Sequence, residues 1–263
     1  MGTAGILPGR PAGQARSDVT YSCTSPSFYA DWNAPSGGRS TPYRWESVLT
    51  GSLPAYMTSR GFFNRTLIGL SMSGAQAVMI ANNNRDKYSR VVSMSGMLNP
   101  TARCPLRTLP TADPVTYNLS QALAKNCGIS MQTLLRLAAL DAGGYNLNNM
   151  WGTAPNDKST AMDPTVQLLS GKLAGLHMWV YAGNGVWANH QPQGANQVDY
   201  YKTGLSSTSI ELLAKAQSAN FAGLAPLAGV NVRTSFPGAG THAWGYWQDQ
   251  IWYIASTGWF KNG

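Results

Sequence analysis

The chain has 263 residues, of which 43% are hydrophobic and 11% are charged. This composition is typical of a globular chain and suits a single α/β domain. A net charge of +8 and a pI near 9.5 would suit a nucleic-acid partner. The Lys and Arg residues are scattered, however, so we predict no nucleic-acid partner and favour attraction to an anionic envelope. No apolar run reaches the length of a membrane span, so we expect no transmembrane segment.

The first residues differ in composition from the rest of the chain. Residues 1–22 are rich in Gly, Pro, Ala and Arg and contain no strand-like run. They also lack the apolar core of a signal peptide. We therefore predict a disordered N-terminal segment over 1–22 and one folded domain over 23–263.

Strands and helices alternate along that domain, and we find no internal repeat. A helix is expected over 45–57 with a kink at Pro54, because proline cannot continue the backbone hydrogen bonds. The other predicted elements, in chain order, are a strand at 65–70, a helix from Gly74, a strand at 90–94, a helix at 131–140, a strand at 178–181, an irregular loop at 185–205, a helix at 206–222, a strand at 230–236 and a closing segment at 248–255.

The segment around Ser71 indicates a chemistry. Residues 65–70 form a short apolar strand, Ser71 lies in a tight turn, and a helix follows. An α/β-hydrolase presents its nucleophile in this way, because small residues at the bend let the hydroxyl project from a sharp turn. Gly69 occupies the position two residues before the serine, where the G-x-S-x-G pattern has its first glycine. Ser73 stands where the pattern has its second glycine. The pattern alone is also compatible with an ordinary strand-to-helix turn.

The order of titratable residues supports the hydrolase interpretation, since a triad of this fold runs serine, acid, histidine. His242 lies on a Gly-rich loop after the predicted strand at 230–236. His177 begins a buried-looking strand and His190 lies in a polar stretch, so His242 is the candidate base. After the strand at 178–181 the candidate acids are Asp199 and Glu211. Glu211 could equally be a carboxylate that complements the dipole of a helix N-terminus, and spacing leaves the two acids open.

A series of sequence blocks resembles the antigen 85 mycolyltransferases, a cell-envelope family of mycolate-bearing actinobacteria. The blocks follow the family's order, and they are 27–32 (SFYADW), 43–50 (YRWESVLT), 69–74 (GLSMSG), 94–100 (MSGMLNP), 141–145 (DAGGY), 150–152 (MWG), 179–185 (WVYAGNG) and 240–247 (GTHAWGYW). The resemblance implies an α/β-hydrolase fold, with a central, mostly parallel sheet and helices on both faces.

The resemblance also implies roles for individual residues. Ser71 matches the nucleophile, His242 the base and Glu211 the triad acid, which favours Glu211 over Asp199. The backbone N–H of Met72, directly after the nucleophile, matches an oxyanion donor. Asn99 and Trp244 match positions that are associated with substrate contact in the family. Ala243 departs from the family, which usually has serine between the histidine and the tryptophan.

The activity implied by the resemblance is transfer of a mycoloyl group through an acyl-serine. The partners would be trehalose mycolates and other envelope glycolipids, and we expect a secreted or envelope-bound monomer. Two alternatives stay open: a generic serine carboxylesterase and a non-catalytic relative that binds envelope carbohydrate or lipid. Little chain precedes Ser71, and the family's first strands and oxyanion loop have no counterpart in it. We therefore expect an N-terminally incomplete sheet with reduced activity.

Cysteines and histidines indicate no metal or cofactor site, because no pair has ligand spacing. The three cysteines are Cys23, Cys104 and Cys127. Cys104 and Cys127 flank a segment that is longer than the antigen 85 proteins have there. Because that family is exported, the resemblance implies a disulfide between the two and a leftover Cys23. The alternative is that all three thiols are unpaired.

Overall fold

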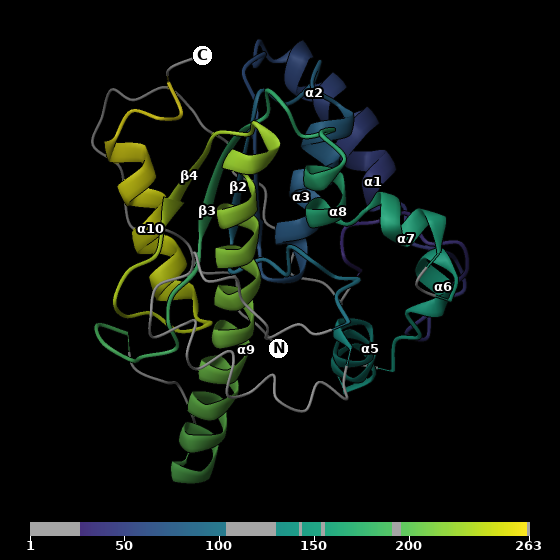
Figure 1. Ribbon diagram of the computed structural model, residues 1–263. Helices are drawn as coiled ribbons and strands as arrows, with labels where there is room; N and C mark the ends of the chain where they lie inside the picture. Colours follow the sequence, from purple (N-terminus) through teal and green to yellow (C-terminus); the bar gives the residue numbers. More distant parts are fainter. Residues whose placement is uncertain (1–26, 104–129, 142–143, 154–155, 191–195, 262–263) are drawn as a thin grey trace.

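The computed structural model describes residues 27–103, 130–141, 144–153, 156–190 and 196–261 (Figure 1). The N-terminal segment 1–22 and the expected disulfide between Cys104 and Cys127 lie outside the described residues. In the part of the chain that is described, no helix is both long enough and apolar enough to cross a bilayer.

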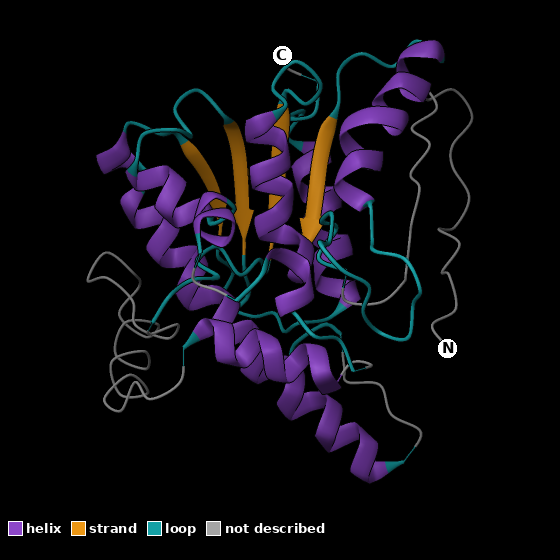
Figure 2. Cartoon of the chain, turned by 90° about the vertical axis from the view of Figure 1, so that its right-hand side faces the viewer, coloured by secondary structure: helices purple, strands orange, loops and turns teal. Residues whose placement is uncertain are grey.

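A four-stranded parallel sheet forms the centre of the domain (Figures 1 and 2). In spatial order its strands are β1 (Thr66–Leu70), β2 (Arg90–Met94), β3 (His177–Tyr181) and β4 (Val232–Ser235). Leu70 pairs with Met94, Met94 with Tyr181, and Tyr181 with Ser235. The carboxyl ends of all four strands therefore meet at one edge of the sheet, which is where open α/β sheets place their ligand sites.

Helices cover both faces of the sheet, as the α/β-hydrolase prediction requires (Figure 1). The helices on the first face are α3 (Met72–Asn83), α8 (Pro164–Leu169) and α9 (Gln197–Leu224), and the helix on the second face is α10 (Trp244–Ser256). Val91 and Val92 of β2 face opposite cores, because successive side chains of a strand alternate. This two-sided burial explains why all five residues of β2 are buried rather than every second one, including the polar Arg90 and Ser93.

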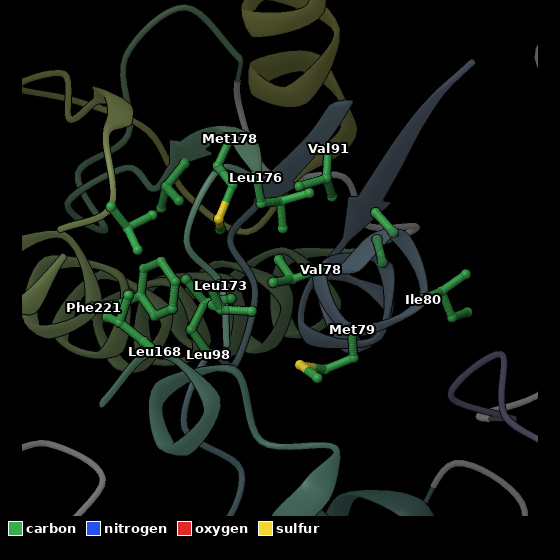
Figure 3. Close-up of a cluster of buried hydrophobic side chains, with 14 of the residues drawn as sticks. Val78, Met79, Ile80, Val91, Leu98, Leu168, Leu173, Leu176, Met178 and Phe221 are labelled. Carbon is green, nitrogen blue, oxygen red and sulfur yellow. The ribbon is translucent and has the colours of Figure 1, made fainter. Parts of the chain in front are cut away.

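The larger core lies between the sheet and the helices of the first face (Figure 3). Val78 and Ile80 of α3 pack in this cluster with Met178 of β3 and Phe221 of α9, and all four are buried. Burying a side chain of this size stabilises the fold by roughly 1.5–3 kcal/mol. The core thereby holds α3 against the end of β1, where Ser71 is located.

The remaining helices lie around this sandwich. They are α1 (Trp45–Ser47), the π-helical η1 (Val48–Ser52), α2 (Leu53–Ser59), α5 (Met131–Asp141), α6 (Asn148–Trp151), α7 (Asp157–Ala161) and the 3₁₀ turn η2 (Pro226–Ala228). The predicted helix is continuous from α1 to α2, and a π-helical turn, η1, directly precedes α2, which has Pro54 in its first turn. In η1 the carbonyl of Leu49 accepts a hydrogen bond from the Tyr88 hydroxyl.

Three predicted boundaries are wrong, and one of them is the start of the closing segment predicted at 248–255, which begins as α10 at Trp244. Helix α9 begins at Gln197 rather than at 206, so part of the predicted loop is helical and Glu211 lies near the middle of the helix. Two apolar side chains near its start are exposed: Val198 is 74% exposed and Leu205 is 70% exposed. Hydrophobic periodicity therefore gave no helical signal there. Helix α3 begins at Met72 rather than at Gly74, directly after Ser71.

A buried carboxylate orders the segment that follows β2. Asp163 caps α8 by accepting hydrogen bonds from the backbone N–H groups of Thr165 and Val166. Its second oxygen accepts from the N–H of Thr101 at 2.9 Å and from the Thr101 hydroxyl at 2.6 Å. Burial raises the pKa of Asp163 above its ordinary value, and these four hydrogen bonds oppose that shift. Asp163 thereby joins α8 to the chain beside Pro100.

Candidate active site

Ser71 occupies the sharp turn between β1 and α3. Its backbone has φ 54° and ψ −120°, a region that costs a non-glycine residue on the order of 1–3 kcal/mol. The Ser71 N–H donates to the carbonyl of Met94 at 2.9 Å, and the Ser71 carbonyl accepts from Gly74 N–H at 2.9 Å. The turn leaves no room for a side chain at Gly69, where a Cβ would lie 2.3 Å from the carbonyl oxygen of Ser73.

Ser73 stabilises the same turn. Its hydroxyl accepts from the N–H of Leu70 and donates to the carbonyl of Leu70, both at 2.8 Å. The serine thus closes a ring onto the last residue of β1. Ser73 stands where the G-x-S-x-G pattern has glycine, and its hydroxyl stabilises the turn at that position.

The structure brings Ser71, His242 and Glu211 together although they are far apart in the sequence. His242 Nε2 lies 2.6 Å from Ser71 Oγ, and His242 Nδ1 lies 2.8 Å from Glu211 Oε2. His242 follows β4 on the loop before α10, and its N–H donates to the carbonyl of Ser207 on α9. The imidazole therefore bridges the hydroxyl and the carboxylate through its two ring nitrogens.

Glu211 is completely buried, with 0% of its surface exposed. A buried carboxylate is costly unless every oxygen is paired. Oε2 is paired with His242, and Oε1 accepts from the Ser95 hydroxyl at 2.7 Å and from Gly183 N–H at 2.6 Å. Burial raises the pKa of the nearby Tyr181 hydroxyl above its ordinary value, and the negative charge of Glu211 raises it further.

Sequence reasoning missed two residues of this network, Ser95 and Trp247. The indole N–H of Trp247 donates to Ser95 Oγ at 2.9 Å, and Ser95 in turn donates to Glu211. The Trp247 ring also stands edge-on to the His242 imidazole, with centroids 4.9 Å apart and planes at 86°. The available signal for Ser95 was its place directly after β2, at the carboxyl edge of the sheet. Nothing local distinguishes Trp247 from the other tryptophans.

Two glycines allow the loops after β3 and β4 to touch. A Cβ at Gly183 would lie 2.3 Å from the carbonyl oxygen of Gly240. The same carbonyl accepts from the N–H of Gly185, and Gly240 N–H donates to Val186, both at 2.8 Å. This contact places Gly183 N–H against Glu211 and leaves His242 two residues beyond the contact.

The other predicted site residues lie outside the hydrogen-bonded chain. Met72 is the first residue of α3, so its N–H lies at the helix N-terminus, where such groups lack intrahelical partners. Trp244 begins α10, is 60% exposed, and packs edge-on against Trp247 at 5.4 Å. Asn99 is half-buried after β2, and its N–H donates to the side chain of Gln217 on α9.

The rejected alternatives are placed elsewhere. His177 is exposed at the start of β3. His190 Nε2 lies 2.8 Å from Asp249 Oδ2, and its ring packs on Tyr246. Asp199 lies in the first turn of α9, and its side chain is outside the described residues.

A cavity borders the first turn of α3 beside Ser71. Its walls come from α3, from the segment after β2, and from α5, α6 and the chain around α7, and most of its lining is apolar. The lining residues are Phe28, Met72, Ala75, Gln76, Met97, Pro100, Gln132, Leu135, Arg136, Leu147, Asn148, Met150, Trp151, Gly152, Ser159 and Met162. Among the residues that the structure describes, no group of three His, Cys, Asp or Glu side chains could hold a metal ion.

Comparison with known proteins agrees with this architecture. A family model described as "Putative esterase" matches residues 6–256, a range that includes residues 6–22, for which the sequence blocks showed no counterpart. The chain therefore belongs to this esterase family, and its sheet, helices and strand-turn-helix segment are those of an α/β-hydrolase fold.

Within that class the chain is a homologue of the antigen 85 proteins. It is 31% identical over 231 residues to "Diacylglycerol acyltransferase/mycolyltransferase Ag85A" of Mycobacterium leprae, covering 86% of this chain and 59% of the relative. It is 32% identical over 232 residues to the Ag85B protein of Mycolicibacterium smegmatis, covering 86% and 61%. The chain thus spans about three fifths of the length of these curated relatives.

A solved structure supports the fold. The crystal structure of Mycobacterium tuberculosis MPT51 (FbpC1) superposes with a TM-score of 0.59 at 20% identity, covering 88% of this chain and 72% of that chain. At this identity the likeness concerns the fold alone.

Proposed function

We propose that this chain is a serine-dependent acyltransferase in which Ser71 is the nucleophile, His242 the general base and Glu211 the acid of a triad. The observation that carries the proposal is the continuous hydrogen-bonded chain from Ser71 through His242 to a fully buried Glu211. A strained serine at a strand-to-helix turn supplies the exposed hydroxyl that such a triad activates.

The reaction would proceed in two steps. Ser71 Oγ attacks the carbonyl carbon of an ester while His242 Nε2 takes the hydroxyl proton. The oxyanion then accepts a hydrogen bond from the N–H of Met72 at the start of α3, where the helix dipole also favours negative charge. The leaving alcohol takes the proton back from His242, and an acyl-Ser71 ester remains.

In the second step an acceptor hydroxyl loses its proton to His242 and attacks the acyl-Ser71 carbonyl. Ser71 leaves with the proton that His242 returns, and the acceptor carries the acyl group. Throughout, Glu211 holds the imidazole through Nδ1 and stabilises the imidazolium that forms. Water as acceptor would give hydrolysis, the reaction of a carboxylesterase.

The acyl group that we propose is a mycoloyl chain, transferred between trehalose mycolates or onto other envelope acceptors. The printed names of the Ag85A and Ag85B relatives, which include mycolyltransferase, and the largely apolar cavity beside Ser71 support it. Trp244 and Asn99 are proposed to contact the substrate. We further propose a secreted or envelope-associated monomer, consistent with the positive net charge and an anionic surface.

A labelling experiment tests the nucleophile. A fluorophosphonate ester should modify the chain at Ser71, and Ser71→Ala should abolish labelling. Ser256→Ala is the matched control, because Ser256 is an exposed serine at the end of α10 and should leave labelling unchanged. Labelling that persists in Ser71→Ala would overturn the assignment. Product formation from a trehalose mycolate with and without added trehalose then separates transfer from hydrolysis.

A further inference from the structure

The segment 183–190, which follows β3, contacts the chain on both sides of His242. Before His242, Gly240 exchanges two backbone hydrogen bonds of 2.8 Å with this segment. After His242, the first turn of α10 receives the end of the segment. His242 lies between these two contacts, so its position depends on how firmly the 183–190 segment is held.

Tyr246 of α10 makes the backbone contacts at the end of this segment. Its hydroxyl accepts from the N–H of Ala188 at 2.7 Å and donates to the carbonyl of His190 at 3.1 Å. The ring of Trp187 stands edge-on to the Tyr246 ring, with centroids 6.4 Å apart. Because Tyr246 is buried and lies in the first turn of α10, the segment is attached to a helix rather than to another loop.

The side chain of His190 completes the contact with α10. Its imidazole occupies space that a side chain on Gly245 would need, since a Cβ there would lie 2.3 Å from His190 Nδ1. The ring stands edge-on to Tyr246, with centroids 4.8 Å apart and planes at 88°. His190 Nε2 lies 2.8 Å from Oδ2 of Asp249, which shares a face of α10 with Gly245. Three residues of one helix therefore hold the imidazole in a single orientation.

We propose that His190 is a positioning residue for the triad: its imidazole, seated on Gly245, keeps the 183–190 segment on α10 and thereby holds His242 within reach of Ser71. The side chains of His190 and Asp249 are 34% and 59% exposed, so the charge of this pair contributes little. The fit of the ring on Gly245 and Tyr246 carries the contact instead. The inference rests on the proposed function for the role of His242, but not for the contact itself.

The expected effect follows from the geometry of the triad. His242 Nε2 lies 2.6 Å from Ser71 Oγ, and a displacement of about 1 Å at a reacting group can cost on the order of 10²-fold in rate. The backbone bonds of Gly240 limit the displacement. We therefore expect His190→Ala to lower kcat for p-nitrophenyl butyrate roughly three- to tenfold, with KM nearly unchanged. Asp249→Asn should change kcat less than His190→Ala does.

Gly245→Ala provides the sharpest test, because the helix by itself favours the substitution. Alanine is a better helix former than glycine, so a contact without a positioning role predicts an unchanged kcat. We expect Gly245→Ala to displace the imidazole and to lower kcat as His190→Ala does. In the double variant the methyl group has no ring to displace, so the second substitution should cause no further loss. An unchanged kcat in Gly245→Ala, or losses that multiply in the double variant, would overturn the proposal.

Hydrogen exchange followed by mass spectrometry tests the contact without turnover. In His190→Ala the amides of residues 240–243 should exchange faster than in wild type, whereas those of β2 should not change. His177→Ala is the matched control, because His177 is exposed at the start of β3 and should alter neither exchange nor kcat. Unchanged exchange in His190→Ala would overturn the proposal, as would faster exchange with an unchanged kcat. If wild type hydrolyses no ester, the proposed function fails, and exchange alone decides whether His190 holds the His242 loop.

Discussion

The hydrogen-bonded network of the triad and the cavity beside Ser71 differ in how their buried polar groups are paired. On the side of the sheet and α10, Glu211 is paired with His242, Ser95 and Gly183, and Ser95 is paired in turn with Trp247. In the cavity, the donors of Gln76 and Trp151 are buried without hydrogen-bond partners among the residues that the structure describes.

The difference concerns how firmly each set of side chains is held before a ligand binds. A fully paired network is rigid and holds charged groups in one geometry before any substrate arrives, which is what acid–base chemistry requires. Unpaired donors weaken the fold until something accepts their hydrogen bonds. The triad network is therefore preorganised, whereas Gln76 and Trp151 carry donors that no described residue pairs.

The largest effect should come from removing the charge of Glu211. Glu211→Gln is nearly isosteric, yet it cannot stabilise the imidazolium of His242, so we expect kcat to fall by roughly 10³–10⁴. Asp199→Asn, at the other candidate acid, should change kcat little. Steady-state kinetics of Glu211→Gln, His242→Ala and the double variant provide the measurement. Losses that multiply independently would mean that the two residues do not act as a unit.

Filling the contact between the loops after β3 and β4 should be the next largest effect. Gly183→Ala would place a Cβ 2.3 Å from the carbonyl oxygen of Gly240, and we expect a loss of about 1–3 kcal/mol in the free energy of unfolding. Urea denaturation measures this. Gly238→Ala is the matched control in the neighbouring loop, since a Cβ there meets nothing within 4 Å. Equal stabilities of the two variants would show that the loops can move apart at little cost.

A smaller effect is expected from the tryptophan behind the triad. Trp247→Phe keeps an aromatic ring near His242 but removes the hydrogen bond to Ser95, which is worth about 0.5–1.5 kcal/mol. We expect kcat to fall about three- to tenfold with KM nearly unchanged. Ser95→Ala should make the effect of Trp247→Phe disappear, because both act on Glu211 through the same hydroxyl. Additive losses in the double variant would argue against this route.

The smallest effect has the opposite sign. Gln76→Leu removes a buried amide whose donor is unpaired, so the ligand-free protein should gain up to about 1 kcal/mol of stability. Thermal unfolding would detect this as a raised midpoint. A lowered midpoint would indicate that Gln76 supports the fold, and the triad and the cavity would then differ less in how their buried polar groups are paired.

Local sequence patterns determined the elements that carry the candidate site. Small residues around Ser71 predict the strand, turn and helix because a sharp bend tolerates little else. The Gly-rich run before His242 predicts a loop for a similar reason, and the order of Ser71, Glu211 and His242 follows from the chain alone. These features depend on a few neighbouring residues, so a sequence pattern can show them.

Tertiary structure alone decided how those elements meet. Between Asp199 and Glu211, residue spacing left the choice open, and only the packing of α9 against the strand ends brings Glu211 to His242. Ser95 and Trp247 are 152 residues apart, and no local signal relates them. The unpaired amide of Gln76 likewise becomes visible only when the cavity walls are in place. Hydrogen-bond partners and burial are properties of the folded chain, because they depend on residues that are close in space and distant in sequence.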